Sequence, residues 1–336
     1  MRRGLLLAVV GLSATRCGGC GGDRCGGFDC DTLAGVDFRA EMRLWVQEIS
    51  ARARAANGAF LVVPQNGQEL LSLDGEAGGP PAAAYGAAID GVGREDLFYG
   101  YAGDDVATGA AETAYLQGFL DLAEANGVEA LVTDYCSTPS KMDDSYVRND
   151  ARGYISFAAD HRELDDLPSY PAEPFHATND TITTLAQAQN FLYLLNASAF
   201  GSADAMVTAL ASTRYDLLIV DAYHDGTAPL SAAQVQALKL KAGGGGRLVI
   251  AYMSIGEAED YRYYWQSAWR DDRPDWLGAE NPDWPGNYKV EYWAPGWKAL
   301  IAGDGGYLDR ILAAGFDGIY LDLIDAFEHF EEISAP

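Results

Sequence analysis

The stretch that decides the fold class reads GFDGIYLDLID and occupies residues 315–325. Its apolar run from Ile319 to Leu321 has the length of a buried strand, and two acids follow it, Asp322 and Asp325. An apolar strand that delivers acids at its carboxyl end is typical of the catalytic face of a (β/α)₈ barrel. An aspartate at this place can equally cap the following helix, so the stretch alone leaves both interpretations open.

The same pattern recurs along the chain. Eight short apolar runs read as strands, and helical stretches separate most of them: 60–63, 87–92, 129–133, 154–158, 190–195, 217–220, 247–253 and 319–321. Alternation of this kind predicts an α/β fold with parallel strands and covering helices. Eight such units favour a single (β/α)₈ (TIM) barrel over two doubly wound halves.

Helical spacing of apolar residues predicts helices at 37–56, 110–126, 203–211, 231–242 and 298–314. The predicted barrel therefore begins with a helix, and its last strand lies near the end of the chain. In a closed barrel the first helix would pack beside the last strand. Residues 164–180 are rich in proline and acids, which predicts a linker or a long surface loop.

The N-terminal residues predict export. Met1, Arg2 and Arg3 precede an apolar run, 4–14, that is too short to span a membrane, so residues 1–16 are interpreted as a signal peptide. Cys17 is a candidate for lipidation and thus for a membrane tether, although the preceding Thr15-Arg16 is a poor match to a lipoprotein cleavage site. Both simple secretion and attachment to the cell envelope remain open.

Residues 17–36 form a stretch rich in cysteine and glycine, which we interpret as a tether between the signal peptide and the folded domain. Its four cysteines, Cys17, Cys20, Cys25 and Cys30, could instead bind a metal or form two disulfides.

The formal net charge of the chain is −26. A field of this sign repels nucleic acid and anionic membranes and favours neutral or cationic partners. Excess acid can also serve only to keep a secreted protein in solution, so charge alone does not name a ligand.

Motifs for other chemistries are missing from the sequence. It contains no His-Glu-x-x-His, no P-loop and no Gly-x-Ser-x-Gly, and its four histidines give no reason to expect a metal site or a cofactor. Carboxylates are abundant instead at the ends of predicted strands: Glu95, Asp134, Asp160, Asp221, Glu257, Glu259, Asp322 and Asp325. Paired carboxylates suit glycoside hydrolysis, in which one donates a proton and the other acts at the anomeric carbon.

Residues 261–297 hold eleven tyrosines and tryptophans and several prolines, which predicts an irregular segment above the barrel face. Aromatic faces bind sugar rings well, but large aromatic side chains also fill cores. Both roles remain open for this segment.

Three stretches together resemble glycoside hydrolase family 114: YDLLIVD (215–221), AYMSIGEAEDYR (251–262) and GFDGIYLD (315–322). That family has (β/α)₈ barrels and includes endo-α-1,4-polygalactosaminidases. The most similar branch is bacterial and archaeal, and some of its members are labelled cysteinyl-tRNA synthetase-related. Neither nucleotide-binding signature of such synthetases occurs here, so aminoacylation is not expected.

The order of the pieces differs from that of the family. By resemblance, residues 181–336 correspond to family strands one to four, and residues 37–163 correspond to strands five to eight. Residues 164–180 would join the two parts. The chain therefore resembles a circular permutant of one barrel, residues 37–336, cut after the fourth family strand.

The resemblance implies roles for particular residues. Asp322 would be the nucleophile or stabiliser and Glu95 the proton donor, which requires a raised pKa. The remaining candidates are substrate-binding residues: Asp221, Ser254, Glu257, Arg262, Asp134 and Tyr252. Leu323 departs from the asparagine that characterised polygalactosaminidases have there, which makes the substrate less certain than the reaction class.

The resulting hypothesis is a glycosidase that cleaves internal α-1,4 linkages in a galactosamine-type polymer, with a polysaccharide or oligosaccharide, in particular a cationic one, as its partner. The alternative is a carbohydrate-binding barrel at the cell surface without turnover, which would need no acids paired across the pocket.

Overall fold

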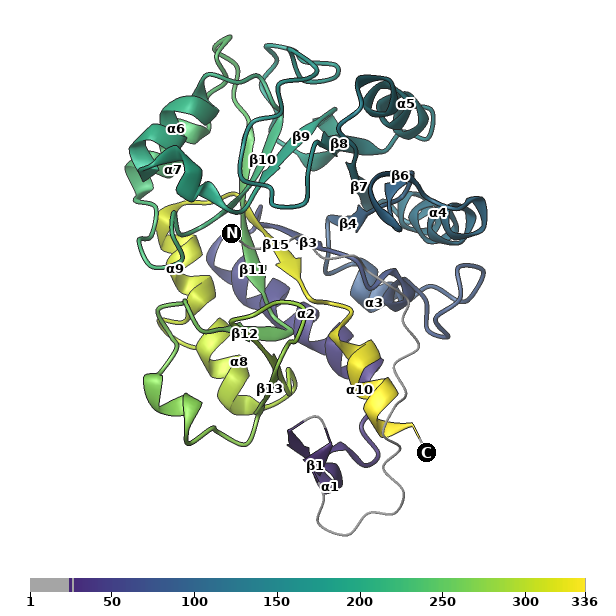
Figure 1. Ribbon diagram of the computed structural model, residues 1–336, viewed down its shortest axis with the longest axis vertical. Helices are drawn as coiled ribbons and strands as arrows, with labels where there is room; N and C mark the ends of the chain where they lie inside the picture. Colours follow the sequence, from purple (N-terminus) through teal and green to yellow (C-terminus); the bar gives the residue numbers. More distant parts are fainter. Residues whose placement is uncertain (1–23, 26, 336) are drawn as a thin grey trace.

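The computed structural model describes residues 24–25 and 27–335 and has a mixed α/β fold (Figure 1). The predicted signal peptide, Cys17 and Cys20 lie outside the described residues. Eight parallel strands form the centre of the molecule: β3 (Leu61–Pro64), β4 (Gly91–Glu95), β7 (Glu129–Tyr135), β8 (Ile155–Ala159), β9 (Phe191–Leu194), β10 (Leu217–Asp221), β11 (Leu248–Ser254) and β15 (Gly318–Asp322). The α/β class and the parallel pairing expected from the sequence are confirmed.

The parallel strands pair in two groups. One group has the order β3-β15-β11-β10-β9, and the other has the order β4-β7-β8. Two single bridges connect the groups: Gln65, just after β3, pairs with Gly93 of β4, and Ser156 of β8 pairs with Asn190, just before β9. Each of the eight strands therefore has a parallel neighbour on both sides.

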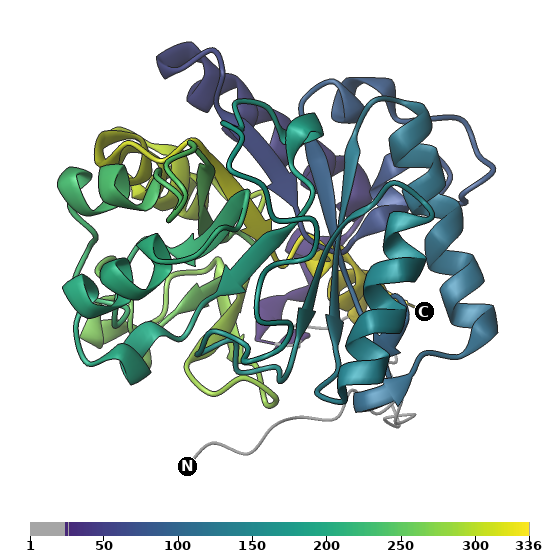
Figure 2. The same ribbon diagram turned by 90° about the horizontal axis from the view of Figure 1, so that it is seen from above.

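Helices lie on the outside of these strands (Figure 2). The longer ones are α2 (Phe38–Ala56), α4 (Ala110–Ala125), α5 (Pro139–Asp150), α6 (Ala203–Ala211), α7 (Ala232–Leu238), α8 (Pro295–Ala302), α9 (Tyr307–Ala314) and α10 (Ala326–Ser334). Helix α2 could be predicted because its apolar residues at helical spacing, from Phe38 to Ala53, are buried against the rest of the fold. Asp37 caps this helix by accepting a hydrogen bond from the Ala40 amide, at 2.9 Å.

Three predicted elements are wrong in their bounds. The helix predicted over 231–242 is α7, which ends at Leu238, and Leu240 already pairs with Gly246. The predicted strand 87–92 begins only at Gly91, because the alanine-rich residues before it form a short helix, α3 (Ala83–Gly86), and a turn. Glu95 is consequently the last residue of the strand. The single helix predicted over 298–314 is two helices, α8 and α9, because three glycines separate them and Gly305 has a φ of +72°.

Residues 164–180 contain no helix and cross the molecule from one edge of the strands to the other. The Leu164 carbonyl accepts hydrogen bonds from the amides of Leu195 and Asn196, at the carboxyl end of β9. Further along, the Phe175 carbonyl accepts a hydrogen bond from the side chain of Asn190, at the amino end of the same strand. This segment therefore connects β8 to β9 in the place where other strands are followed by a helix.

The aromatic segment after β11 is more regular than expected. It contains a three-stranded antiparallel sheet in the order β12 (Glu257–Glu259), β14 (Asn287–Val290) and β13 (Leu277–Glu280). Most of its aromatic rings pack on one another, as Trp265 does on Tyr288 with ring centroids 4.7 Å apart. Trp284 and Tyr261 are exposed exceptions, so core filling is the main role of these rings.

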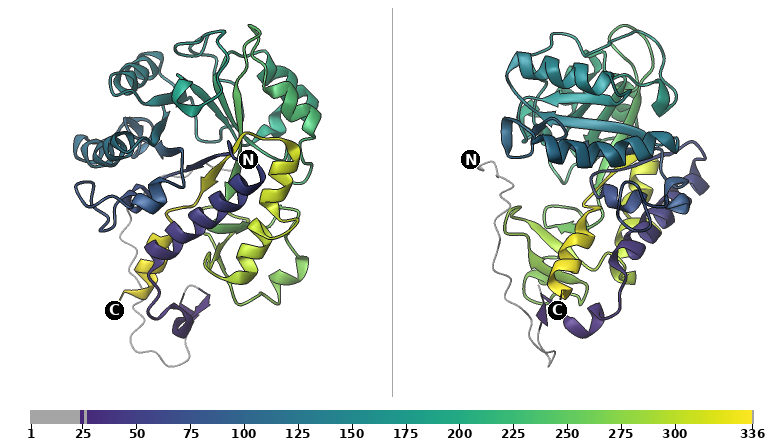
Figure 3. Two further views of the ribbon diagram at one scale, coloured as in Figure 1. Left: turned by 180° about the vertical axis from the view of Figure 1, so that it is seen from behind. Right: turned by 90° about the vertical axis from the view of Figure 1, so that its right-hand side faces the viewer.

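The last helix lies along the first. Helix α10 follows β15 and packs against the N-terminal part of α2 (Figures 1 and 3). Phe38 stacks on Phe330 with ring centroids 5.5 Å apart, and Arg39 forms an ion pair of 2.7 Å with Glu331. The two ends of the described domain are thus neighbours in space.

Candidate active site

The candidate site lies at the carboxyl ends of the parallel strands. Because parallel strands point the same way, the side chains at their carboxyl ends gather on one face of the fold. The side chains that lie there and bond to one another include those of Glu95, Asn66, Tyr135, Tyr252 and Asp322.

Asp322 is the last residue of β15, beside Ser254 of β11. The Tyr252 hydroxyl donates a hydrogen bond of 2.7 Å to its Oδ2, and the Leu323 amide donates one of 2.8 Å to its Oδ1. Burial raises the pKa of Asp322 to about 8, and the negative charge of Glu95 contributes to the rise. With this pKa, the protonated form of the Asp322 side chain predominates at neutral pH.

Glu95 is the last residue of β4, and two donors hold its carboxylate. The Asn66 side-chain amide donates a hydrogen bond of 2.9 Å to Oε2, and the Tyr135 hydroxyl donates one to Oε1. Both partners come from the carboxyl ends of the strands on either side, β3 and β7. The negative charge of this carboxylate is, after burial, the next cause of the raised pKa of Asp322.

The raised pKa that the sequence led us to expect for Glu95, as the proton donor, stays a prediction. The structure places a raised pKa on Asp322, where burial is the largest cause and the negative charge of Glu95 the next.

Tyr320 lies on β15, two residues before Asp322, and its hydroxyl reaches towards Gly93 of β4. Its ring contacts that of Tyr193, with centroids 5.2 Å apart, and the Tyr193 hydroxyl donates a hydrogen bond of 2.8 Å to Gln65. A side chain on Gly93 would overlap the Tyr320 hydroxyl, so glycine at this position leaves room for the phenol. These buried rings form the floor below Glu95 and Asp322.

Arg262 and Asp221 belong to a buried ion-pair group. The Arg262 guanidinium donates a hydrogen bond of 2.8 Å to Asp221 and one of 2.6 Å to Glu259. Burial raises the pKa of Asp221, and Arg262 opposes this rise. Arg262 is 3% exposed, so it acts here by holding Asp221 and Glu259 in place.

Ser254 and Glu257 hold the turn after β11. The Ser254 hydroxyl donates a hydrogen bond of 2.8 Å to the Glu257 carbonyl. The buried Glu257 carboxylate accepts from Asn281, at 2.8 Å, and pairs with Lys289, at 2.5 Å. Both residues thus connect the strand ends to the small antiparallel sheet.

Asp134 stands apart from the carboxylate pair. It has no exposed surface, and it accepts hydrogen bonds from the Phe98 and Tyr99 amides, at 2.8 and 3.1 Å, and from the Ser145 hydroxyl, at 2.6 Å. Such burial leaves no surface for a substrate to contact. Its partners indicate that Asp134 fixes the loop after β4 against α5.

Asp325 begins α10, and its side chain makes no capping hydrogen bond to that helix. Burial raises its pKa to about 6, while the positive charges of Lys289 and Arg94 oppose the rise. Asp325 therefore adds negative charge beside the pair rather than stabilising the helix end.

Two contributors were missed at the sequence level, Asn66 and Tyr135. Each follows or ends an apolar run, as the predicted acids do, so their position at a strand end was a usable signal. Amides and phenols are common at such places, which is why only the acids were singled out.

One group of side chains has the spacing of metal ligands. Ligand atoms of Asp160, His161 and Asp166 lie within 4.8 Å of one another. Both ring nitrogens of His161 already contact carboxylates, Nδ1 that of Asp160 at 2.8 Å and Nε2 that of Asp165 at 2.7 Å. The group is therefore satisfied as an ion-pair cluster of the loop after β8.

In the part of the chain that the structure describes, no helix combines the length and the apolar composition needed to cross a bilayer.

Residues 172–335 match the family model described as Glycoside-hydrolase family GH114. This part of the chain belongs to GH114. The match confirms the resemblance seen in the sequence, and it lies wholly in the half that contains Asp322, Asp221 and the turn after β11.

Curated relatives are similar over part of the chain. An uncharacterized protein of Methanocaldococcus jannaschii is 41% identical over 153 residues, which are 46% of this chain and 42% of the relative. Uncharacterized proteins of Deinococcus radiodurans and Thermotoga maritima are 43% identical over 131 residues and 38% identical over 143 residues. These matches cover 39% and 43% of this chain and 40% and 41% of those relatives, so the chain spans less than half the length of each.

Proposed function

We propose that this protein is a glycoside hydrolase that cleaves internal α-1,4 linkages of a galactosamine-type polymer. The observation that carries the proposal is that Glu95 and Asp322 each end a parallel strand on the same face of the fold, where burial and then the charge of Glu95 raise the pKa of Asp322. Membership of residues 172–335 in GH114 supports glycosidase chemistry in general. Substrate and linkage rest on the resemblance to polygalactosaminidases.

The reaction needs one proton donor and one carboxylate, and the two acids would supply these roles. Protonated Glu95 would donate its proton to the glycosidic oxygen as the bond to the anomeric carbon breaks and the oxygen keeps the electron pair. Asp322 would stabilise or bond to the positive anomeric carbon. Water then adds to that carbon, and its proton returns to Glu95.

Asp322 acts in this scheme in its ionised form. In the unliganded protein, burial and then the charge of Glu95 raise its pKa to about 8. Positive charge that develops at the anomeric carbon favours ionised Asp322. Tyr252 supports this state, because its hydrogen bond stabilises the ionised form of Asp322.

We further propose that the eight strands form one (β/α)₈ barrel that is circularly permuted. Three observations support this: the parallel pairing on both sides of every strand, the family match that begins inside the segment 164–180, and the packing of α10 on α2. The helix-free segment would join what are the two chain ends in the ordinary order.

The acidic character of the chain supports a cationic glycan, and export to the cell surface or medium would bring the enzyme to it. Secretion and a tether through Cys17 are proposals from the sequence alone. A carbohydrate-binding barrel without turnover is the second candidate, and the exposed Trp284 and Tyr261 would suit it.

The test is release of oligosaccharides from polygalactosamine of graded deacetylation. We expect internal cleavage, seen as a fall in polymer length before short products accumulate, and a rate that rises with the fraction of free amines. Cleavage of neutral glycans only would reject the substrate, and binding without any cleavage would favour the second candidate.

A further inference from the structure

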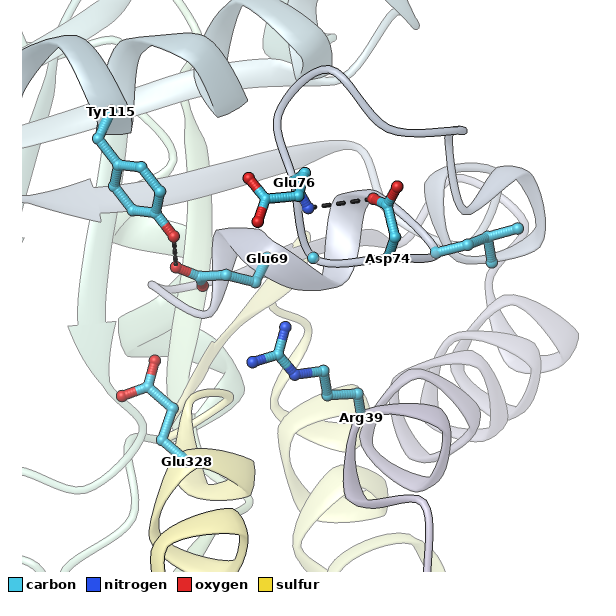
Figure 4. Close-up of a pocket in the computed structure, with 8 residues that line it drawn as sticks. Arg39, Glu69, Asp74, Glu76, Tyr115 and Glu328 are labelled. Atoms are coloured by element: carbon cyan, nitrogen blue, oxygen red, sulfur yellow. Dashed lines mark hydrogen bonds between the residues drawn. The ribbon is translucent and has the colours of Figure 1, made fainter.

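A hollow lies where α2, α10 and the residues around η1 (Gln68–Leu71) meet (Figure 4). Its volume is about 560 Å³. Four carboxylates and one guanidinium line it, those of Glu69, Asp74, Glu76, Glu328 and Arg39. We call it the Glu69 pocket.

Hydrogen bonds connect the Glu69 pocket to the strand that carries Glu95. Arg94 of β4 donates a hydrogen bond of 3.1 Å to Gln68, which in turn donates one of 3.0 Å to Glu69. Glu328 lies one helical turn after Asp325. The pocket is therefore at the same face of the strands as the catalytic pair.

One oxygen of Glu69 lacks a partner. Oε1 accepts hydrogen bonds from the Tyr115 hydroxyl, at 2.8 Å, and from Gln68, whereas the buried Oε2 accepts none among the described residues. Glu69 is only 9% exposed. A buried charge without a partner is costly, so a cation is the missing component.

The charge balance of the pocket leads to the same conclusion. Burial, followed by the negative charges of Asp325 and Glu69, raises the pKa of Glu328 to about 7. Arg39 and Arg94 oppose this rise, and the Arg39 guanidinium is also paired with Glu331 through two hydrogen bonds, of 2.7 and 3.0 Å.

We infer that the Glu69 pocket binds the protonated amine of an amino-sugar residue, with the carboxylate of Glu69 as its main partner. The walls suit a sugar better than a bare ion, since Leu73 and Tyr115 line the pocket and are 63% and 44% exposed. They offer apolar surface to the C–H face of a sugar ring. Within the described residues, the spacing required for a metal is found at Asp160, His161 and Asp166, and not among these carboxylates.

This inference rests on the proposed function, to which it adds a binding subsite for a second residue of the same polymer. A polymer bound at two places is positioned for cleavage between its ends, because the outer subsite anchors sugars away from the reacting bond. The subsite accepts an amine and should reject an N-acetyl group, which carries no charge.

The test follows the methyl signals of Leu73 by NMR in the full chain, because they report on this pocket and not on the catalytic pair. D-galactosamine should shift them in the wild type and in Glu129→Gln, a control at the amino end of β7. N-acetyl-D-galactosamine should not. In Glu69→Gln, which keeps the shape of the side chain, binding should be about tenfold weaker or more.

Equal shifts with the acetylated sugar, or equal affinity in Glu69→Gln, would overturn the inference, and so would an equal shift with calcium chloride. If Glu69→Gln does not fold, Glu328→Gln at pH 8 replaces it, with weaker binding expected. Failure of the proposed function is a different result: Leu73 shifts with galactosamine would persist although no polymer is cleaved. Cleavage without any Leu73 shift would reject only the subsite.

Discussion

Replacing Asp322 by asparagine should make the protein less sensitive to alkaline pH. In the wild type, burial and Glu95 raise the pKa of Asp322 from 3.8 to about 8. Between these values the folded protein holds a proton that the unfolded chain has released, so the free energy of unfolding falls as pH rises. Asparagine does not titrate and removes this dependence.

The size of the effect follows from the proton balance. From pH 5 to pH 8 the wild type loses about 1.36 kcal/mol per pH unit through this group, hence about 4 kcal/mol in total. This is a ceiling, since Asp322 is partly exposed, and we expect at least about 1.5 kcal/mol. Urea unfolding at pH 5 and pH 8 measures the change.

Two further variants are compared in this experiment, one as a control and one with a smaller expected effect. Asp272→Asn, at an exposed acid in the loop before β13, should follow the wild type at both pH values. Glu95→Gln removes the charge next to Asp322 and should reduce the pH dependence without abolishing it. An Asp322→Asn protein that loses as much stability as the wild type between pH 5 and pH 8 would refute the reasoning.

Three further changes test other parts of the site. Tyr252→Phe removes a hydrogen bond that stabilises ionised Asp322, so the alkaline limb of kcat/KM against pH should move up by about half to one pH unit. Arg262→Leu leaves buried carboxylates unpaired and should lower the free energy of unfolding by about 3–5 kcal/mol, measured by urea titration. Gly93→Ala overlaps the Tyr320 hydroxyl and should cost about 1–3 kcal/mol, and adding Tyr320→Phe should recover part of it in a thermal melt.

Each of these has a contradicting result. If the alkaline limb of kcat/KM against pH is unchanged in Tyr252→Phe, the ionisation of Asp322 does not control the activity. Arg270→Ala is the control for Arg262, since it breaks an exposed pair worth less than about 1 kcal/mol, and equal losses in the two variants would reject the buried network. A Gly93→Ala protein as stable as the wild type would show that the Tyr320 hydroxyl does not lie against Gly93.

Much of the fold could be predicted because burial imposes a pattern on the sequence. Strands such as 217–221 are buried on both sides and read as continuous apolar runs. The errors arose where neighbouring residues favour different secondary structures. Alanines 82–84 favour helix although a strand follows shortly after, and the glycines before Tyr307 divide a helix whose apolar spacing continues across them.

The candidate site was predictable only in part. Asp322 could be found because it ends an apolar run, whereas Glu95 was assigned from the resemblance to the family. Their interaction depends on a strand, β3, that comes from another part of the chain. The donors that hold the Glu95 carboxylate, Asn66 and Tyr135, could not be foreseen, because these contacts are set by tertiary packing. The burial of Asp134 likewise depends on α5, a helix that the apolar pattern did not indicate.

The central claim is that Glu95 and Asp322 together cleave a glycosidic bond. The most direct measurement is the release of reducing ends from partly deacetylated polygalactosamine by the wild type, Glu95→Gln, Asp322→Asn and the control Glu129→Gln, each shown to be folded. We predict that the wild type and the control cleave at similar rates and that either change in the pair lowers the rate by about a hundredfold or more. Equal rates in all four proteins would contradict the claim.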